Sequence, residues 1–347
     1  MQDFFDGIKG NRALRTELGL ELRRGTFPHA HIIEGARGSG KHLLATQIAM
    51  ALACEHRTDG GFPLPCGTCR SCRRIREHNC PDVITVKRVG DRATMGVEVI
   101  RELREGLAIV PNDLNVKVYI IEDAHTMTVQ AQNALLLTLE EPPPFVVFLL
   151  LSEDASALLE TVRSRAPTHR LQPIDAETMR DFLLTDAAAR AAGAPALAAE
   201  HPEELEALIT LSAGSVGLAL TLLSSEKRAP LMERRTRVSE LISCLLDRTA
   251  SDRLLLALLS LGTAREAVAA DLAMLKLALR DLLVLNRAEH PALLFYTERE
   301  AAAELAARFT AAKILALTEE IEKATDALAA NANVRLTVIN LFNHLST

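Results

Sequence analysis

The sequence predicts an α/β protein in which a parallel sheet covered by helices is followed by two all-helical regions. Short apolar runs alternate with helical patterns from residue 1 to about 170, as in sheets whose crossover connections are helices. Strand signals almost disappear after about residue 174, and from about 230 Leu and Ala recur at the spacing of amphipathic helices. Aromatic residues make up only 3% of the chain and Trp is absent, so the core must be mainly aliphatic, which favours helices.

Four short runs are the predicted strands of the sheet. They are β-branched or apolar and have strand length, whereas the segments between them have helical patterns. The runs span residues 31–33, 83–86, 118–121 and 146–151. A chain of 347 residues is long enough for two or three domains, and the charged, Pro-containing stretch 225–237 is a candidate boundary.

The composition predicts a soluble protein that does not bind nucleic acid through its own charge. Hydrophobic residues make up 48% of the chain, charged residues 24%, and the formal net charge is −6. Because nucleic-acid-binding domains are usually basic, we expect any contact with DNA to be made as a member of a larger assembly. No apolar run reaches the roughly 18 residues that span a bilayer. The first ten residues lack the basic flank and apolar stretch of a signal peptide, so we expect a cytoplasmic protein without a membrane partner.

A phosphate-binding loop is predicted where the first strand ends. Residues 35–42 read Gly-Ala-Arg-Gly-Ser-Gly-Lys-His and match the first seven positions of G-x-x-x-x-G-K-[ST], between a strand and a helix at 43–53. The glycines let backbone amides turn toward phosphate oxygens, and the helix N-terminus adds a favourable dipole. ATP or ADP is the expected nucleotide, and Lys41 is expected to reach the β- and γ-phosphates. The candidate nucleotide-binding residues of this loop are Gly35, Gly38, Gly40, Lys41 and His42.

Two departures from the usual pattern predict that hydrolysis by this chain is weak or absent. His42 stands where the motif has the hydroxyl that binds Mg²⁺, and imidazole is a poor substitute because Mg²⁺ prefers hard oxygen ligands. The strand at 118–121 ends in Glu122 and Asp123, whereas such ATPases usually place Asp first, for the metal, and Glu second, for water. The reversed order displaces each carboxylate by about 1.5 Å, one carbon–carbon bond. Misplacement by about 1 Å can lower a rate about 100-fold. The alternative is a glycine turn without a ligand beside two solvated acids.

The helix predicted after the acidic strand resembles one protein family. Residues 133–143, Asn-Ala-Leu-Leu-Leu-Thr-Leu-Glu-Glu-Pro-Pro, are similar to bacterial DNA polymerase III clamp-loader subunits of the gamma/tau and delta-prime types, which usually have Lys where Leu137 stands. The resemblance implies a P-loop AAA+ domain over 1–172, a small helical lid domain over 173–228, and a C-terminal all-α collar domain for oligomerisation over 229–347. It also places Ser152 near the family's sensor-1 position.

A cation for a neighbouring subunit is implied by the same resemblance. Residues 161–166, Thr-Val-Arg-Ser-Arg-Ala, are similar to the family's Ser-Arg-Cys motif, with Ala166 in place of Cys. In the family this arginine projects into the ATP site of the adjacent subunit, a role that would fall to Arg165. Charge grows on the γ-phosphoryl oxygens in the transition state, so a cation delivered in trans can contribute about 10³–10⁵ in rate. If the other motifs of this family were missing from the sequence, Arg165 would be interpreted as an ordinary solvent-exposed charge.

Further segments extend the resemblance to both ends of the chain. Residues 5–11 are similar to the family's N-terminal segment beside the adenine, and residues 331–345 to the end of its collar helices. Residues 214–220 resemble its sensor-2 helix, but Gly217 or Leu218 stands where the family has Arg. This third loss on the nucleotide side fits delta-prime better than gamma/tau.

The cysteines predict a zinc site in an insertion at 54–80. Cys66, Cys69 and Cys72 are separated by two residues each, which lets thiolates face one tetrahedral Zn²⁺. Cys54 and Cys80 compete as the fourth ligand, with His78 a further alternative. The resemblance favours Cys54, because the family takes its first ligand at the end of the helix after the phosphate loop.

Three functions are therefore weighed. The first is a delta-prime-like clamp-loader subunit that joins gamma/tau and delta in a hetero-oligomer and helps to load the sliding clamp on primed DNA. It would offer Arg165 to a neighbouring ATPase, with Glu122 and Asp123 as a degenerate acidic pair. The second is an active gamma/tau-type motor ATPase. The third is a zinc-stabilised AAA+ adaptor outside replication.

Overall fold

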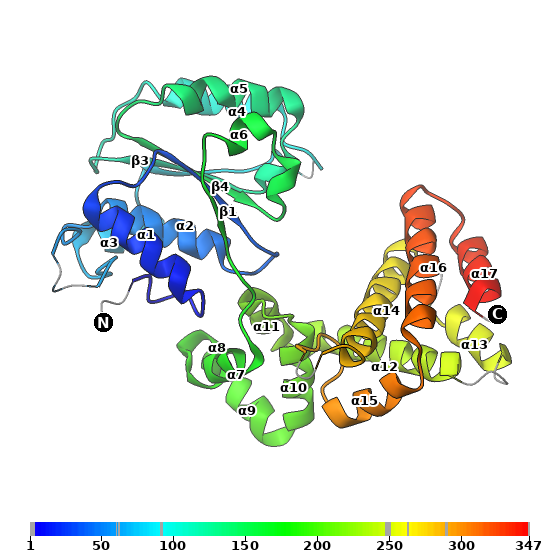
Figure 1. The fold of residues 1–347 in the computed structure, drawn as a ribbon. Coiled ribbons are helices and arrows are strands. Elements are labelled where there is room, and N and C mark those ends of the chain that lie inside the picture. The colour runs from blue at the N-terminus through cyan, green and yellow to red at the C-terminus, as the bar shows by residue number, and fades with distance from the viewer. Residues whose placement is uncertain are drawn as a thin grey trace. The chain divides into compact units, whose positions relative to one another are not determined.

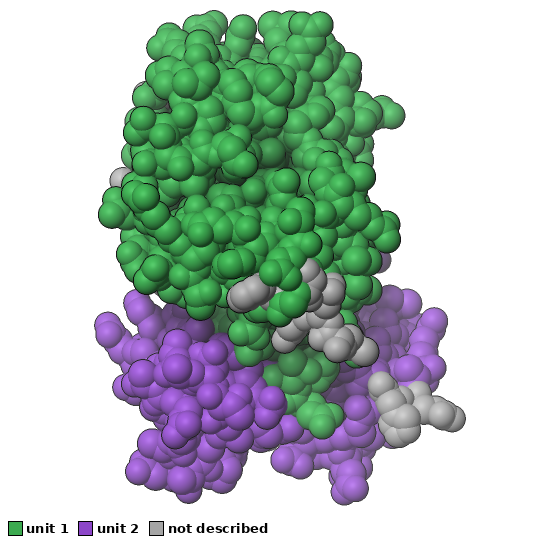
Figure 2. Space-filling model, turned by 90° about the vertical axis from the view of Figure 1, so that its left-hand side faces the viewer, with its two compact units in different colours: residues 1–178, 215–218 green, residues 179–214, 219–347 purple. Residues whose placement is uncertain are grey.

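A computed structural model describes residues 4–59, 61, 63–90, 93–246, 251–261, 264–288 and 291–345. The chain forms two compact units, one of residues 1–178 with 215–218 and one of residues 179–214 with 219–347 (Figure 2). The first unit contains the sheet and the second is helical. The three-domain division at 172/173 and 228/229 stays a prediction.

The first unit is built on a five-stranded parallel sheet, which confirms the predicted α/β class. The strand order is β2-β3-β4-β1-β5, so β1 lies between β4 and β5. The four predicted runs all lie in strands. The strands are β1 (Ala30–Glu34), β2 (Val83–Val86), β3 (Lys117–Ile121), β4 (Val146–Ser152) and β5 (Thr168–Arg170).

Helices cover both faces of this sheet (Figure 1). One face packs against α1, α2 and α3, and the other against α4, α5 and α6. Side chains of β4 alternate between the two cores, Leu149 on one side and Phe148 on the other, as strand geometry requires. The central strands β3 and β4 are buried throughout, which explains their continuous apolar sequence. The helices are α1 (Arg12–Arg24), α2 (Lys41–Leu52), α3 (Arg70–Arg76), α4 (Val97–Gly106), α5 (Val129–Glu140) and α6 (Glu160–Arg163).

The carboxyl ends of three neighbouring strands meet at one edge of the sheet. The loop after β1, the acids after β3 and the end of β4 therefore lie together, as ligand sites do in open parallel sheets. Register pairs Glu34 with Ser152, and the Gly35 amide donates to the Ser152 carbonyl over 3.1 Å. The first phosphate-loop residue is thereby fixed to the end of the neighbouring strand.

The remainder of the described chain is helical. The helices are α7 (Ala176–Thr185), α8 (Ala187–Ala191), α9 (Ala194–Glu200), α10 (Pro202–Leu211), α11 (Val216–Leu222), α12 (Ser225–Leu246), α13 (Ser251–Leu259), α14 (Arg265–Leu285), α15 (Arg299–Ala307), α16 (Ala311–Ala329) and α17 (Val334–Leu345). Helix α12 runs through the charged stretch 225–237, with Pro230 inside it, so this stretch is not a break in secondary structure. None of the helices in the described parts of the chain has both the length and the hydropathy needed to cross a bilayer.

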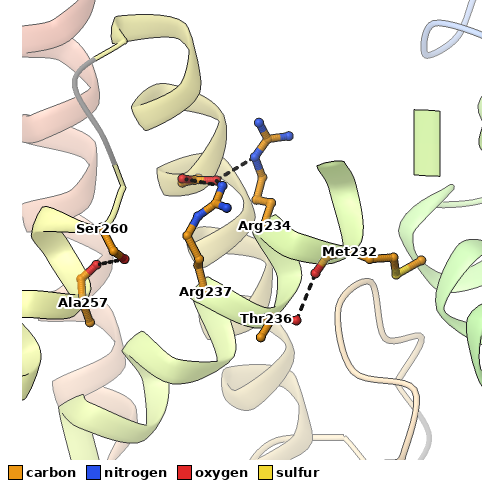
Figure 3. Close-up of polar contacts among 7 residues, drawn as sticks. Met232, Arg234, Thr236, Arg237, Ala257 and Ser260 are labelled. Atoms are coloured by element: carbon orange, nitrogen blue, oxygen red, sulfur yellow. Dashed lines mark hydrogen bonds and ion pairs between the residues drawn. The ribbon is translucent and has the colours of Figure 1, made fainter. Parts of the chain in front are cut away.

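A buried acid joins two long helices of the second unit. The Asp271 side chain on α14 is fully buried, and its carboxylate accepts from Arg234 Nε over 2.7 Å and Arg237 Nη2 over 3.2 Å. Both arginines extend from α12 toward this carboxylate (Figure 3). A buried charge is tolerated only when it is paired and hydrogen-bonded, so this cluster fixes how α12 and α14 face each other.

Candidate nucleotide site and cysteine cluster

The loop between β1 and α2 has the backbone conformation that its glycines permit. Gly38 and Gly40 have φ of +76° and +96°, which residues with a Cβ rarely adopt. The Gly217 amide donates to the Gly38 carbonyl over 2.9 Å, and a Cβ on Gly217 would lie 2.9 Å from the Gly38 Cα. Ser215 Oγ also donates to the Arg37 carbonyl over 3.0 Å. The segment predicted to resemble sensor 2 thus touches the loop through backbone and hydroxyl groups.

Lys41 lies against the loop itself. Its Nζ donates to the Gly35 and Ala36 carbonyls over 2.7 and 3.0 Å. Burial lowers the pKa of Lys41, although the negative charges of Glu153 and Asp123 act to raise it. To hold a phosphate, this ammonium group must exchange the two carbonyls for phosphate oxygens.

Both predicted acids have cationic partners from this chain. Glu122 Oε1 lies 3.1 Å from His42 Nδ1, and Glu122 Oε2 lies 3.4 Å from Lys87 Nζ. Asp123 Oδ2 accepts from Arg88 Nη2 over 3.1 Å. The sequence analysis identified the two acids and His42 but missed Lys87 and Arg88. These two residues directly follow strand β2, and this position could have indicated that they lie near the site. These residues do not fit Mg²⁺. The carboxylates that would bind it are already paired with cations, and the His42 imidazole stands where a hydroxyl would bind it.

A second group of possible ligands lies at the same edge and was missed from the sequence. One ligand atom each of Asp123, His125 and Glu153 lies within 4.8 Å of the others. The Glu153 amide donates to His125 Nδ1 over 3.3 Å. The group combines residues from the ends of β3 and β4. An acid after each of these two strands is the sequence feature that could have predicted it.

Ser152 ends β4 inside the protein. Its side chain is fully buried, and its Oγ donates to the Asp154 carbonyl over 2.7 Å. The hydroxyl thus shapes the turn after β4. Its role beside a nucleotide stays a prediction.

Arg165 lies at the surface, apart from the phosphate loop, just after α6. Its Nη1 donates to the Thr161 carbonyl over 2.8 Å, and its Nη2 pairs with Glu140 Oε1 at 2.5 Å. The Arg165 and Glu140 side chains are 35% and 45% exposed, so the pair is open to solvent. The last residue of α5 therefore holds this guanidinium in one direction.

Four cysteines of the insertion come together in a buried cluster. The sulfurs of Cys54, Cys66, Cys69 and Cys72 lie within 4.8 Å of one another, and all four residues are buried. The Cys66 and Cys72 sulfurs are 3.9 Å apart, too far for a disulfide and close to the roughly 3.8 Å between thiolates bound to one tetrahedral Zn²⁺. This donor set fits zinc.

Hydrogen bonds in the cluster favour a thiolate. Burial raises the pKa of Cys66, but backbone and hydroxyl donors of Cys69 and Thr68 outweigh it and bring this pKa to about 6. The Cys69 amide lies 3.3 Å from the Cys66 sulfur. Burial raises the pKa of Cys72, which is the energetic cost that a metal ion would offset.

Cys80 and His78 lie outside this group of four sulfurs. They line a separate cavity of about 200 Å³ together with His42, Thr46 and Thr85. Burial raises the pKa of Cys80. The structure thus brings Cys54, and not Cys80, to the other three cysteines.

Known proteins resemble this chain in the sheet-containing region. The family model described as "DNA polymerase III, delta subunit" matches residues 10–175. The chain is 36% identical over 180 residues to DNA polymerase III subunit tau of Escherichia coli, covering 52% of this chain and 27% of the relative. It is 32% identical over 244 residues to subunit tau/gamma of Haemophilus influenzae, covering 70% of this chain and 33% of the relative.

The chain matches the DNA polymerase III clamp-loader family over its sheet-containing region, residues 10–175. It spans about a third or less of the length of these tau-type relatives. A gamma subunit-related protein from Thermotoga maritima has a similar solved structure, with 18% identity, a TM-score of 0.45 and coverage of 95% of this chain and 98% of that chain.

Proposed function

We propose that this chain is a delta-prime-like subunit of the DNA polymerase III clamp loader, which helps to load the sliding clamp on primed DNA. It hydrolyses ATP weakly or not at all and offers Arg165 to the ATP site of a neighbouring subunit. The observation that carries the proposal is the contrast between a partly exposed, oriented Arg165 and acids that are already paired within the chain.

The surroundings of Arg165 support its action in trans. An arginine that acts on a neighbouring subunit must reach beyond its own subunit. Arg165 lies at the surface rather than beside Lys41. Glu140 holds the guanidinium from the end of α5. The side chain is therefore restricted before any neighbour binds, which lowers the entropy lost on docking.

Several features support weak hydrolysis by the chain itself. Water activation and metal binding both need free carboxylates at the strand end. Glu122 faces His42 and Lys87, while Asp123 faces Arg88. In addition, residues 214–220 contain no arginine to contact a phosphate from the sensor-2 side.

The cysteine cluster has a structural role in this proposal. Zn²⁺ bound by Cys54, Cys66, Cys69 and Cys72 links the end of α2 to the insertion and the start of α3. Such closed four-thiolate sites stabilise a fold and leave no open position for catalysis. The insertion then presents a rigid surface to a partner subunit.

Assembly is the test of this function. Purified chain is mixed with gamma/tau and delta subunits, and the mass of the resulting complex and its loading of a sliding clamp on primed DNA are measured. We expect one hetero-oligomer that contains this chain and loads the clamp faster than the mixture without it. A chain that stays separate from these subunits would rule the proposal out.

An active motor of gamma/tau type is the second candidate, because the relatives reported above are tau and gamma subunits. It predicts steady ATP turnover by the isolated chain that Lys41→Ala abolishes. We expect no turnover above that of the Lys41→Ala chain. The distinction is measurable with purified protein alone.

A further inference from the structure

The two cations beside the acids are placed by the register of the sheet. Strands β2 and β3 are parallel, Val86 pairs with Ile121, and the Glu122 amide donates to the Val86 carbonyl over 3.0 Å. The next residues along the two strands are therefore Lys87 beside Glu122, then Arg88 beside Asp123. The observed distances of 3.4 and 3.1 Å agree with this placement. The pairing of the two strands therefore brings the partners of both ion pairs together.

The charges of these pairs balance without a metal ion. Two carboxylates at this edge carry a charge of −2, which a divalent cation would neutralise in a magnesium-dependent site. Lys87 and Arg88 carry +2 in the same place. His42 adds a third nitrogen, 3.1 Å from Glu122, at the position where a hydroxyl would bind the metal. A divalent cation entering here would have to displace these partners and face their repulsion.

We propose that Lys87 and Arg88, together with His42, take the place of magnesium, so that the loop binds a nucleoside di- or triphosphate in its metal-free form. The inference rests on the phosphate-binding loop predicted from the sequence and on the weak hydrolysis of the proposed function, and it names the form of the ligand. Phosphate charge is then met by the loop amides and by Lys41, while Lys87 and Arg88 neutralise the two carboxylates that would otherwise repel the phosphates. Binding needs no metal, and the metal-bound water chemistry of an ATPase is absent.

The neighbouring group of Asp123, His125 and Glu153 is the competing site for a cation. It contains one imidazole and two carboxylates, a donor set that suits Mn²⁺ or Zn²⁺ better than Mg²⁺. Asp123 already pairs with Arg88, and the fields of Asp123 and Glu153 act on the Lys41 ammonium group. The charges of this group are thus partly neutralised by Arg88 and Lys41. Because its donor set suits Mn²⁺, the experiment below includes this ion.

Calorimetric titration of the full chain with ADP and with ATP tests the proposal. Each nucleotide is titrated in EDTA, in Mg²⁺ and in Mn²⁺. We expect dissociation constants that agree within threefold among the three conditions. Tightening of tenfold or more by either metal would overturn the proposal, and so would the absence of nucleotide binding under all conditions.

Variants separate the role of the two cations from a general effect of charge. Lys87→Ala with Arg88→Ala should weaken binding in EDTA at least fivefold and make binding metal-dependent. The control, Arg253→Ala with Arg335→Ala, removes the same charge from exposed helical positions and should change neither quantity. Equal effects of the two double variants would also overturn the proposal. Assembly with gamma/tau and delta does not depend on these titrations, so the two proposals can fail separately.

Discussion

At the scale of single residues, the sheet contains a pair of buried histidines that are neutral in the folded protein. His31 on β1 and His169 on β5 have ring nitrogens 2.9 Å apart, and His31 Nε2 lies 3.0 Å from the Pro28 carbonyl. A carbonyl only accepts, so His31 Nε2 carries the proton and His31 Nδ1 accepts from His169. Burial, followed by the charge of His169, lowers the pKa of His31 to about 3, and burial also lowers the pKa of His169.

This pair predicts loss of stability in mild acid. Folded-state pKa values below the unfolded value of about 6.5 mean that the unfolded chain binds more protons between pH 6.5 and 3. The contribution of the neutral pair is complete above pH 6.5 and is lost as pH falls toward 3. For His31 the loss by pH 5 is about 2 kcal/mol.

Denaturant unfolding at pH 7.5, 6 and 5 measures this slope. The double variant His31→Leu with His169→Leu should be less sensitive to pH over this range, whereas His201→Gln, an exposed histidine, should behave as wild type. A wild-type unfolding free energy that stays level between pH 7.5 and 5 would show that the pair does not act in this way.

At the scale of elements, the cluster of four cysteines joins α2 to α3. We expect one zinc per chain by a colorimetric zinc assay, and an unfolding free energy that falls by about 2.7 kcal/mol when a zinc concentration of about 100 times Kd is removed by chelation. Cys72→Ser should lose the metal, whereas Cys80→Ser should keep it because Cys80 lies outside the four sulfurs. Loss of zinc in Cys80→Ser alone would contradict the assignment.

The buried acid between α12 and α14 predicts a second effect at this scale. Asp271→Ala removes the shared partner of Arg234 and Arg237, which are 24% and 30% exposed and can recover water. We therefore expect a loss of about 2–3 kcal/mol, below the cost of breaking a fully buried pair. Asp252→Ala on the exposed side of α13 is the control, with an expected change within about 0.5 kcal/mol. Equal stability of the two variants would contradict the role of Asp271.

The sequence was most informative where periodicity and spacing act locally. The four long strands, the glycine loop and the cysteine spacing could all be predicted without coordinates. Strand β5 could not, because its three residues are polar and alternate between exposed and buried at the edge of the sheet. Pro230 does not end a helix as its position in the charged stretch suggested, since it lies inside α12 although an internal proline removes a helix hydrogen bond.

At the scale of the whole molecule, the site depends on residues far apart in the sequence. The pairing of Lys87 with Glu122 needs the register of β2 and β3, and the contact of Gly217 with Gly38 needs the helical segment to reach the loop. The sequence shows that Lys87 follows a predicted strand, but it does not show which residues of the two strands pair or that Gly217 meets Gly38. The resulting molecule combines a charge-balanced strand edge with a partly exposed arginine, the combination expected of a subunit that serves its neighbour.

The ATPase rate of the reconstituted clamp loader tests this claim most directly. Complexes are assembled with wild-type chain, Arg165→Ala or Arg163→Ala, a nearby exposed arginine that serves as the matched control. We predict that Arg165→Ala lowers the rate at the dependent site by about 1,000-fold or more, the range of a trans-acting arginine, while Arg163→Ala leaves it unchanged. An assembled Arg165→Ala complex that hydrolyses ATP at the wild-type rate would contradict the account.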